Sequence, residues 1–261
     1  MIKVVVLGSG SIVPTPNRFA TSIYIDAGVD KFLLDCGPGT IERMRRAKIN
    51  AWKIGQILLS HFHIDHTADL LPFIKLRAYN EEGKIAINPP TLKIYGPIGL
   101  MSFIEHAINQ NKYLRYLSDI IGYLRYVELY EMDENLIKEQ GDLKISCKKV
   151  KHESGIMYRL DIKNKVIVYS GDTAFNPEIA VFANNADLLI HECSCPKQSM
   201  IGEHTSEVDL SEIISLAKPK RVIITHLYPV WNGLEEELVR KISDKHKCRI
   251  YVAHDMLEIN L

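Results

Sequence analysis

Short apolar runs alternate with amphipathic helical patterns along the whole chain. Apolar runs rich in β-branched residues and bounded by turn residues predict buried strands. Apolar residues at helical spacing predict helices that bury one face. The predicted strands span 2–7, 21–27, 31–35, 56–60, 92–95, 124–130, 143–150, 156–162, 165–170, 187–191, 221–225 and 249–252. The predicted helices span 38–48, 66–79, 97–110, 112–122, 176–184, 206–217 and 233–246. This mixture predicts an α/β protein whose sheets are covered by helices on their outer faces.

Three histidines and an aspartate lie within six residues, directly after the apolar run 57–59. Imidazole nitrogen and carboxylate oxygen are ligands that transition metals favour. In an extended segment alternate side chains share a side, so His61 and His63 can bind one ion together. Asp65 and His66 lie beyond that pair and are placed to reach a second ion. A histidine-rich surface loop is the alternative, and ligands elsewhere in the chain argue against it.

Three further candidate ligands, His152, Asp172 and His226, each follow a predicted strand. Loops at strand ends display side chains from a rigid scaffold, so these residues are expected to converge on the histidine-rich motif. Singly, each has an ordinary explanation: an aspartate can cap a helix or turn, and a lone histidine is usually a polar or core residue. Their occurrence at successive strand ends favours a metal site.

The order HxHxDH, distant His, SGDT and distant His resembles the metallo-β-lactamase superfamily over essentially the whole chain. The segments 7–18, 34–40, 191–194 and 203–206 further resemble ribonuclease Z and its relatives. The resemblance implies a four-layer αβ/βα sandwich with two mixed sheets and a metal cleft at one edge, and we expect one domain over 1–261. The transfer-RNA-binding arm of long-form ribonuclease Z has no room between His152 and Asp172. The stretch 80–90 is the best candidate for a mobile loop over the cleft.

Carried over residue by residue, the resemblance implies two divalent metal ions bridged by Asp172 and by a water or hydroxide. The first ion would be held by His61, His63, His152 and Asp172, and the second by Asp65, His66, Asp172 and His226. Zinc is the default for this ligand set, and manganese or iron fit nearly as well. Two cations lower the pKa of a bridging water toward neutrality, and Asp65 is expected to accept or orient its proton.

Glu192 and His204 extend the resemblance to a substrate class. In ribonuclease Z-like enzymes the matching histidine lies beside the metals and is steadied by the matching glutamate. A histidine there stabilises phosphoryl charge or protonates the departing oxygen, since its pKa lies near the operating pH. A capping loop before the helix that begins near Glu207 is the alternative, and the two roles are compatible. We therefore expect a phosphodiester substrate, either RNA or a small molecule, cyclic ones included.

The composition of the chain agrees with this prediction and adds expectations about membrane association and location. Hydrophobic residues make up 46% and charged residues 25% of the chain, as in ordinary globular proteins. No apolar run approaches the ~20 residues that span a bilayer, and the N-terminus begins with a strand, so we expect no membrane association. Five cysteines without paired spacing predict reduced thiols and a cytoplasmic location. A homodimer is expected from the family alone.

The formal net charge of zero argues against a protein that coats nucleic acid nonspecifically. Two local basic clusters remain, one at 43–48 and one that joins 112–116 with 123–126. Aromatic residues interleaved with cations can stack bases and hold phosphates, as the second cluster would. The alternative for it is a half-buried helical cover with snorkelling basic side chains.

Three other functions fit parts of the sequence. A binuclear hydrolase of a lactam, lactone or thioester would use the same metals on an acyl bond. Proteins that resemble flavodiiron redox enzymes replace the second histidine of the motif with glutamate, and His63 argues against that function. A catalytically silent binding module is disfavoured by the complete ligand set.

Overall fold

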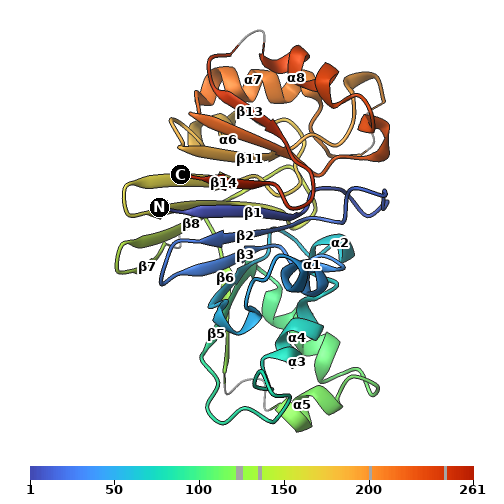
Figure 1. Ribbon diagram of the computed structural model, residues 1–261, viewed down its shortest axis with the longest axis vertical. Coiled ribbons are helices and arrows are strands. Elements are labelled where there is room, and N and C mark those ends of the chain that lie inside the picture. The colour runs from blue at the N-terminus through green and yellow to red at the C-terminus, as the bar shows by residue number, and fades with distance from the viewer. Residues whose placement is uncertain (122–125, 135–136, 200–201, 244–245) are drawn as a thin grey trace.

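Two seven-stranded mixed sheets form the framework of the chain (Figure 1). The computed structural model describes residues 1–121, 126–134, 137–199, 202–243 and 246–261. The first sheet has the order β14 (Glu258–Asn260), β1 (Lys3–Gly8), β2 (Ser22–Asp26), β3 (Lys31–Leu34), β4 (Gln56–Leu58), β5 (Leu92–Pro97), β6 (Val127–Met132). The second has the order β13 (Arg249–Val252), β12 (Arg221–Thr225), β11 (Leu188–Glu192), β10 (Lys165–Tyr169), β9 (Ile156–Ile162), β8 (Leu143–Lys149), β7 (Lys138–Gln140).

Each sheet is antiparallel in one half and parallel in the other. Strands β14, β1, β2 and β3 pair antiparallel, whereas β3 to β6 run parallel. In the second sheet β7 to β10 pair antiparallel, and β10 to β13 run parallel. The carboxyl ends of parallel strands meet at one edge of a sheet, and binding sites of α/β proteins gather at such edges.

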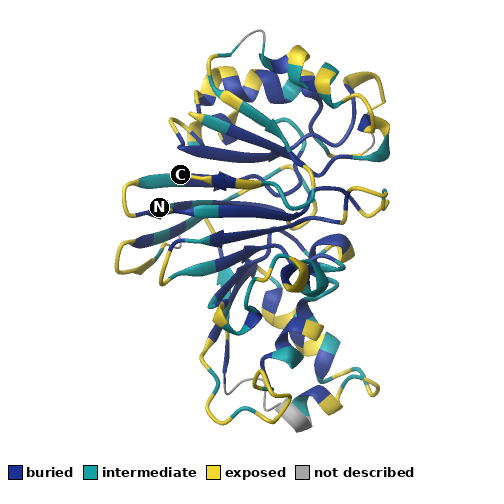
Figure 2. Ribbon diagram, in the orientation of Figure 1, coloured by how far each residue is buried: buried dark blue, intermediate teal, exposed yellow. Residues whose placement is uncertain are grey.

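Side chains that alternate along the strands divide the interior into three cores. Val4 and Val6 of β1 pack between the sheets, whereas Val5 and Leu7 pack on the helical side. The first sheet is covered by α1 (Thr40–Arg46), α3 (Leu70–Leu76), α4 (Leu100–Ile108) and α5 (Tyr116–Ile121). The second is covered by α6 (Pro177–Phe182), α7 (Glu207–Ala217) and α8 (Glu235–Ser243). The buried strands between half-exposed helices are visible in Figure 2, and the predicted four-layer sandwich is confirmed.

Several predicted boundaries differ from the observed ones for local reasons. Strand β7 consists of Lys138–Gln140 and carries no apolar signal, and β14 is only three residues long, so neither was predicted. The helix predicted over 66–79 is divided into α2 (Ile64–Thr67) and α3. At this break the backbone N–H of Cys36 donates to the carbonyl of His66, and the N–H of Asp69 donates to the carbonyl of Cys36. The segment that follows β3 is thus bonded to the chain between α2 and α3. The start of the strand predicted over 124–130 falls partly outside the described residues.

The loop 80–90 lies against the region of η1 (Ala51–Lys53). Asn50 donates to the Glu81 carboxylate at 2.7 Å, and Arg77 donates to the carbonyl of Pro90 at 2.8 Å. These contacts hold the loop at the end of α3 remote from His66, so the prediction that it covers the cleft is wrong. No helix within the described residues has the length and apolar character that crossing a bilayer requires.

Candidate metal centre

All seven predicted ligands converge where strands of both sheets end. Four groups of side chains among the described residues have ligand atoms within 4.8 Å of one another. They are His61 with His63 and His152; His61 with His66 and Asp172; Asp65 with His66 and His226; and Asp172 with His204 and His226. The first sheet supplies the motif that follows β4, and the second supplies the residues that follow β8, β10 and β12. The site therefore lies between the two halves of the sandwich, on the side where α1 and α2 lie in Figure 1.

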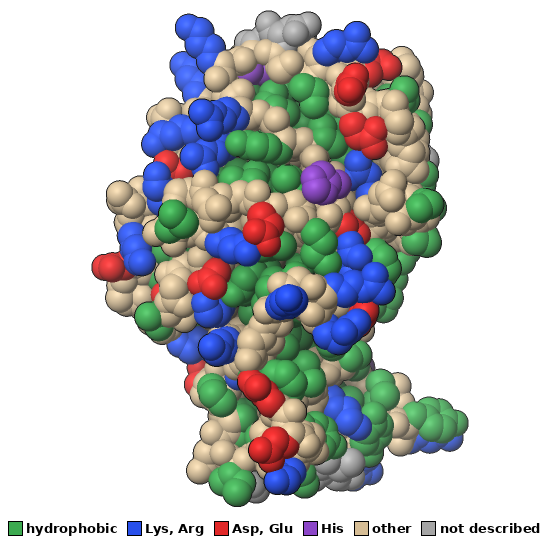
Figure 3. Space-filling view, viewed as in Figure 1, with side chains coloured by type: hydrophobic (Ala, Val, Ile, Leu, Met, Phe, Trp, Pro, Cys, Tyr) green, Lys and Arg blue, Asp and Glu red, His purple; other side chains and the backbone are tan. Residues whose placement is uncertain are grey.

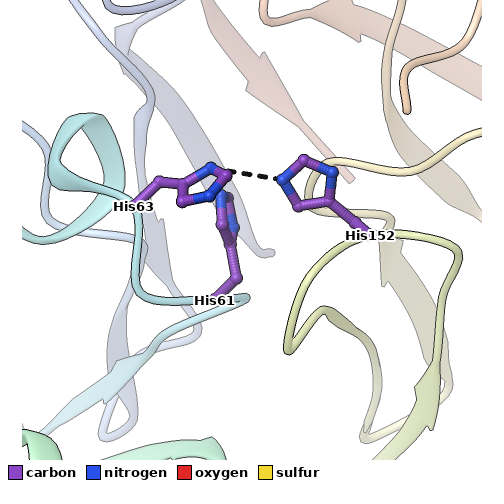
Figure 4. Close-up of side chains that lie close together, drawn as sticks. All are labelled: His61, His63 and His152. Carbon is purple, nitrogen blue, oxygen red and sulfur yellow. Dashed lines mark hydrogen bonds between the residues drawn. The ribbon is translucent and has the colours of Figure 1, made fainter. Parts of the chain in front are cut away.

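His61, His63 and His152 form the first group (Figure 4). His63 Nδ1 lies 3.2 Å from His152 Nε2, and the ring centroid of His61 lies 4.6 Å from that of His63 and 4.7 Å from that of His152. Two nitrogens bound at 2.0–2.1 Å to one tetrahedral zinc ion lie about 3.3 Å apart. The 3.2 Å between the nitrogens of His63 and His152 therefore suits two ligands of one ion.

Asp172 lies at the centre of the cluster and is 3% exposed. Its Oδ2 is 3.8 Å from His61 Nε2, 3.4 Å from His66 Nε2 and 3.2 Å from His226 Nε2. Burial raises the pKa of Asp172, but the adjacent His226 and His66 rings hold it well below its usual range. A charged carboxylate that lies between His61 on one side and His66 and His226 on the other is placed to bridge two cations.

Asp65 belongs to the group that also contains His66 and His226. Its Oδ2 lies 3.4 Å from His226 Nε2 and 3.7 Å from His66 Nε2. Asp65 and His66 are both buried in the short helix α2, which places their side chains next to each other at the cluster.

Two serine hydroxyls determine which nitrogen of the neighbouring imidazoles carries the proton. Ser60 Oγ donates to Asp35 at 2.8 Å, so its oxygen accepts from His61 Nδ1 at 3.0 Å. Ser194 Oγ donates to Glu192 at 2.5 Å and accepts from His226 Nδ1 at 3.0 Å. With the proton on Nδ1, each ring directs its Nε2 lone pair toward Asp172, which is the tautomer that binds a metal through Nε2.

Two imidazole nitrogens at the centre lack hydrogen-bond partners. Among the described residues, His61 Nε2 and His66 Nε2 are buried and form no hydrogen bond, although His66 Nε2 lies 3.4 Å from Asp172 Oδ2. An unpaired buried polar atom costs about 1–3 kcal/mol, and bound metal ions would satisfy both nitrogens. Burial, followed by the charge of His66, also lowers the pKa of His61 to about 2, which favours the neutral form that binds metals. The donor set therefore fits metal ions.

Asp35 organises this centre, and sequence reasoning assigned it no role. Its carboxylate accepts from the backbone and hydroxyl of Ser60, from His66 Nδ1 at 2.7 Å, and from the Tyr169 hydroxyl. It adopts φ 57°, a left-handed conformation that is uncommon outside glycine. The sequence signal that could have found Asp35 is its place directly after the apolar strand 31–34. Asp172 follows a different strand in the same way.

Glu192 and His204 form an ion pair beside the cluster. His204 Nδ1 donates to Glu192 Oε1 at 3.0 Å, and Glu192 also accepts from the backbone of Thr173 at 2.6 Å. The His204 ring lies 5.5 Å from His152 and 5.4 Å from His226. Burial lowers the pKa of His204, but the hydrogen bond and charge of Glu192 outweigh it and raise the pKa above its ordinary value.

Tyr228 is a second residue that sequence reasoning missed. Its ring centroid lies 5.8 Å from those of both His204 and His226. Burial and the charge of Asp172 raise the pKa of Tyr228 to about 12, so its hydroxyl keeps its proton. Its position two residues after His226 was the only available signal.

Other histidines and cysteines lie apart from the cluster. His191 is buried and bonds the carbonyl of Glu192, and His106 is exposed on α4, where it contacts Ser102. Cys193 packs in the core between the second sheet and its helices. Cys195 is also buried.

Comparisons with known proteins agree with this geometry. A family model described as "Anti-Pycsar protein Apyc1" matches residues 2–231. Ribonuclease Z of Pyrococcus horikoshii is 27% identical over 90% of this chain and 89% of its own length. The metallo-β-lactamase fold protein YhfI of Bacillus subtilis superposes with a TM-score of 0.80 at 22% identity, over the full length of both chains. Human tRNase Z, short form, superposes with a TM-score of 0.78 at 19% identity, over 99% of this chain and 98% of the other.

The predicted resemblance is thereby confirmed: this is a ribonuclease Z-like protein of the metallo-β-lactamase superfamily. As such it is a metal-dependent hydrolase. Within that superfamily, the match over residues 2–231 shows that the chain belongs to the family of the anti-Pycsar protein Apyc1.

Proposed function

We propose that the chain is a phosphodiesterase that works with two divalent metal ions, and zinc is the first candidate for both. His61, His63, His152 and Asp172 would hold one ion, and Asp65, His66, Asp172 and His226 the other. The observation that carries the proposal is the Glu192–His204 pair beside this cluster, with its 3.0 Å hydrogen bond. A proton donor next to the metals suits an alkoxide that leaves from phosphorus.

The chain's own groups divide the work at the centre. When bound, the ions would supply a water of lowered pKa and neutralise charge on the attacked phosphoryl group. Asp65 lies 3.4 Å from His226 and faces the same space as Asp172, so its carboxylate is placed to accept or orient the proton of that water. Asp35 and Ser60 keep the neighbouring imidazoles in the required orientation.

His204 would act on the leaving group, whereas Asp65 would act on the attacking water. Its Nδ1 proton is engaged by Glu192, which leaves Nε2 for the substrate. Because the glutamate raises the pKa of His204, a proton on Nε2 is retained closer to neutral pH and can pass to the departing oxygen. Glu192 itself is held by Thr173 and Ser194, so the pair is fixed relative to Asp172.

The substrate we propose is RNA or a small phosphodiester, cyclic ones included. Relatives named ribonuclease Z support RNA, and a structural neighbour titled a diphosphatase of the PhnP family, with a TM-score of 0.71, supports a smaller phosphate compound. A cytoplasmic location and a homodimer are part of the same proposal, and sedimentation of the purified protein tests the dimer.

Turnover of three substrates tests the function. The protein, purified with its native metals, is assayed on bis(p-nitrophenyl) phosphate, an acyl ester and nitrocefin, with Asp172→Ala as the blank. We expect metal-dependent turnover of the phosphodiester alone, and a loss of about 100-fold or more in kcat for His204→Ala. His106→Ala, which alters an exposed histidine on α4, is the matched control and should keep full activity. Turnover of an acyl substrate alone would overturn the proposal.

A further inference from the structure

A pocket of about 360 Å³ lies at the amino ends of β12 and β13, whereas the metal centre lies at the carboxyl ends of the strands. The end of α7, the turn before β12 and the chain before β13 form its walls. Strand β12 has five residues, and His226 follows its last one. At about 3.3 Å per residue, the strand places about 16 Å between the pocket and that proposed ligand. We call it the lysine pocket after Lys218, Lys220 and Lys247, which line it.

The lysine pocket has a positive lining. No aspartate or glutamate among the described residues lines it beside the three lysines. Lys220 Nζ pairs with Asp187 at 2.9 Å, outside the lining. Within the described residues, no ion pair joins Lys218 or Lys247 to an acidic side chain. Figure 3 shows Lys and Arg side chains gathered at the upper left, on the side of α7 and β13 in Figure 1. Because the whole chain has no net charge, this local excess attracts an anion.

Ordinary structural roles account for single lysines of the pocket but not for the group. Lys218 is the C-cap residue of α7, and a cation is stabilising at a helix C-terminus. Lys247 precedes β13, an edge strand of the second sheet, and charged residues discourage pairing between such edges. The ion pair with Asp187 gives Lys220 a role. None of these roles explains why three lysines from two segments surround one concave site that has no carboxylate in its lining.

Contacts that do not involve the lysine side chains hold the walls of the pocket together. The backbone N–H of Arg249 donates to the carbonyl of Lys220 at 3.2 Å, so the start of β13 lies beside the turn before β12. His246 Nε2 lies 3.0 Å from the Ser211 hydroxyl of α7 and is hydrogen-bonded to it. All three lysines of the pocket are exposed. Their ammonium groups are therefore available to a ligand, and the pocket keeps its shape without them.

The two basic clusters that the sequence shows differ from the lysine pocket. In the cluster at 43–48 the three arginines pair with Asp255 or Glu42. The second cluster projects as an exposed segment at 112–116, and its residues 123–125 lie outside the described part of the chain. Sequence reasoning missed the lysine pocket because its cations come from the α7–β12 turn and the α8–β13 connection, which only the folded chain brings together.

We propose that the lysine pocket binds a di- or triphosphate group. A lysine ammonium binds phosphate as a point charge, and a chain of two or three phosphates offers negative charge to lysines on both walls. A concave site suits a small ligand that enters it rather than a flat partner surface. The group can belong to a free polyphosphate or to a nucleotide. This inference goes beyond the proposed phosphodiesterase function and does not depend on it, because the pocket shares no residue with the metal centre.

Calorimetric titration of the metal-loaded protein with sodium diphosphate, sodium triphosphate and ATP tests the pocket. Lys218→Gln with Lys247→Gln should weaken binding by about tenfold or more, because charge-assisted hydrogen bonds are lost. Lys112→Gln with Arg115→Gln is the matched control, since it removes two exposed cations near α5, at the other end of the molecule in Figure 1. It should keep the parental affinity. ATP that binds more tightly than triphosphate would identify a nucleotide as the source of the group, and equal affinities would identify a free polyphosphate.

Cys248 reports whether the pocket itself is occupied. It lines the pocket and is half-buried, whereas the other four cysteines are buried. Its alkylation by iodoacetamide, a neutral reagent, is followed by mass spectrometry. Triphosphate should slow this alkylation in the parent and in Asp172→Ala, in which the metal centre is disrupted. It should not slow it in Lys218→Gln with Lys247→Gln, and an unchanged melting temperature would show that this variant is folded.

Two results would overturn the proposal. One is binding that is lost in Asp172→Ala and kept in Lys218→Gln with Lys247→Gln, because the anion would then occupy the metal centre. The other is alkylation of Cys248 that triphosphate does not slow. Turnover of bis(p-nitrophenyl) phosphate should be the same in the lysine variant and the parent. If the parent binds triphosphate at the pocket but turns over no phosphodiester, the proposed function fails and the lysine pocket stands.

Discussion

Proton positions at the metal centre are decided by single side chains outside the ligand set. Asp35 accepts a hydrogen bond from the Ser60 hydroxyl, which leaves the serine oxygen to accept from His61 Nδ1, and it accepts directly from His66 Nδ1. Ser194 and Glu192 act on His226 in the same way. A carboxylate that fixes the tautomer of a ligand imidazole also raises its basicity toward the metal.

Replacement of Asp35 by asparagine tests this arrangement with almost no change in shape. Its amide would offer donors to Ser60 and His66 where the carboxylate only accepts, so one imidazole would lose its orientation. We expect metal affinity to fall about 10–100-fold, measured by competition with a chelator. Asp26→Asn is the control, because Asp26 at the end of β2 bonds Tyr24 of the same strand and Lys31 of β3. An unchanged affinity in Asp35→Asn would show that these hydrogen bonds do not support the ligands.

The seven proposed ligands were predictable because each belongs to a motif or follows a strand. The residues that orient them were not, since Asp35, Ser60 and Ser194 are ordinary polar residues in the sequence. Their role depends on contacts between segments far apart, such as Tyr169 with Asp35, 134 residues away. Tyr228 was missed for the same reason, because only the folded chain brings its ring against His204.

At the scale of elements, the site depends on how closely the chain segments approach each other. A Cβ added to Gly37 would lie 2.1 Å from the Asp65 carbonyl and 2.9 Å from that of Thr21. The turn before α1 therefore touches the backbone of α2 at Asp65, one of the proposed ligands. Strands and most helices were predicted because their apolar periodicity is strong. The break between α2 and α3 was not, because it arises from tertiary hydrogen bonds to Cys36.

Gly37→Ala should therefore affect stability and metal content together. The added methyl group must displace backbone atoms rather than a flexible side chain, and overpacking of this kind costs about 1–3 kcal/mol of unfolding free energy. The displaced backbone belongs to Asp65, so we expect the protein also to retain less metal on dialysis. Gly55→Ala is the control, since a Cβ there meets nothing within 4 Å. Denaturant unfolding and metal analysis of both variants measure the difference. Equal behaviour of the two would contradict the close approach at Gly37.

At the scale of the molecule, the candidate ligands join the two halves of the sandwich. His61, His63, Asp65 and His66 follow β4 of the first sheet. His152, Asp172 and His226 follow strands of the second sheet. Metal ions held by both sets would bind the folded chain only, because unfolding separates the two sets. A ligand that binds only the folded state stabilises it in proportion to the logarithm of its concentration over Kd.

Removal of metal should therefore lower the melting temperature of the whole chain in a single step. An ion present at 100 times its Kd contributes about 2.7 kcal/mol, and each kcal/mol shifts the melting temperature of a protein near this size by about 2–4 °C. We expect EDTA to lower the melting temperature by about 5–10 °C for each ion lost. Asp172→Ala should melt at a temperature that EDTA barely changes. Our expectation of one domain over residues 1–261 further requires one calorimetric transition with and without metal, because the core between the sheets draws on both halves. Two separate transitions in EDTA would contradict the single domain, and a melting temperature insensitive to EDTA would contradict the ligand set.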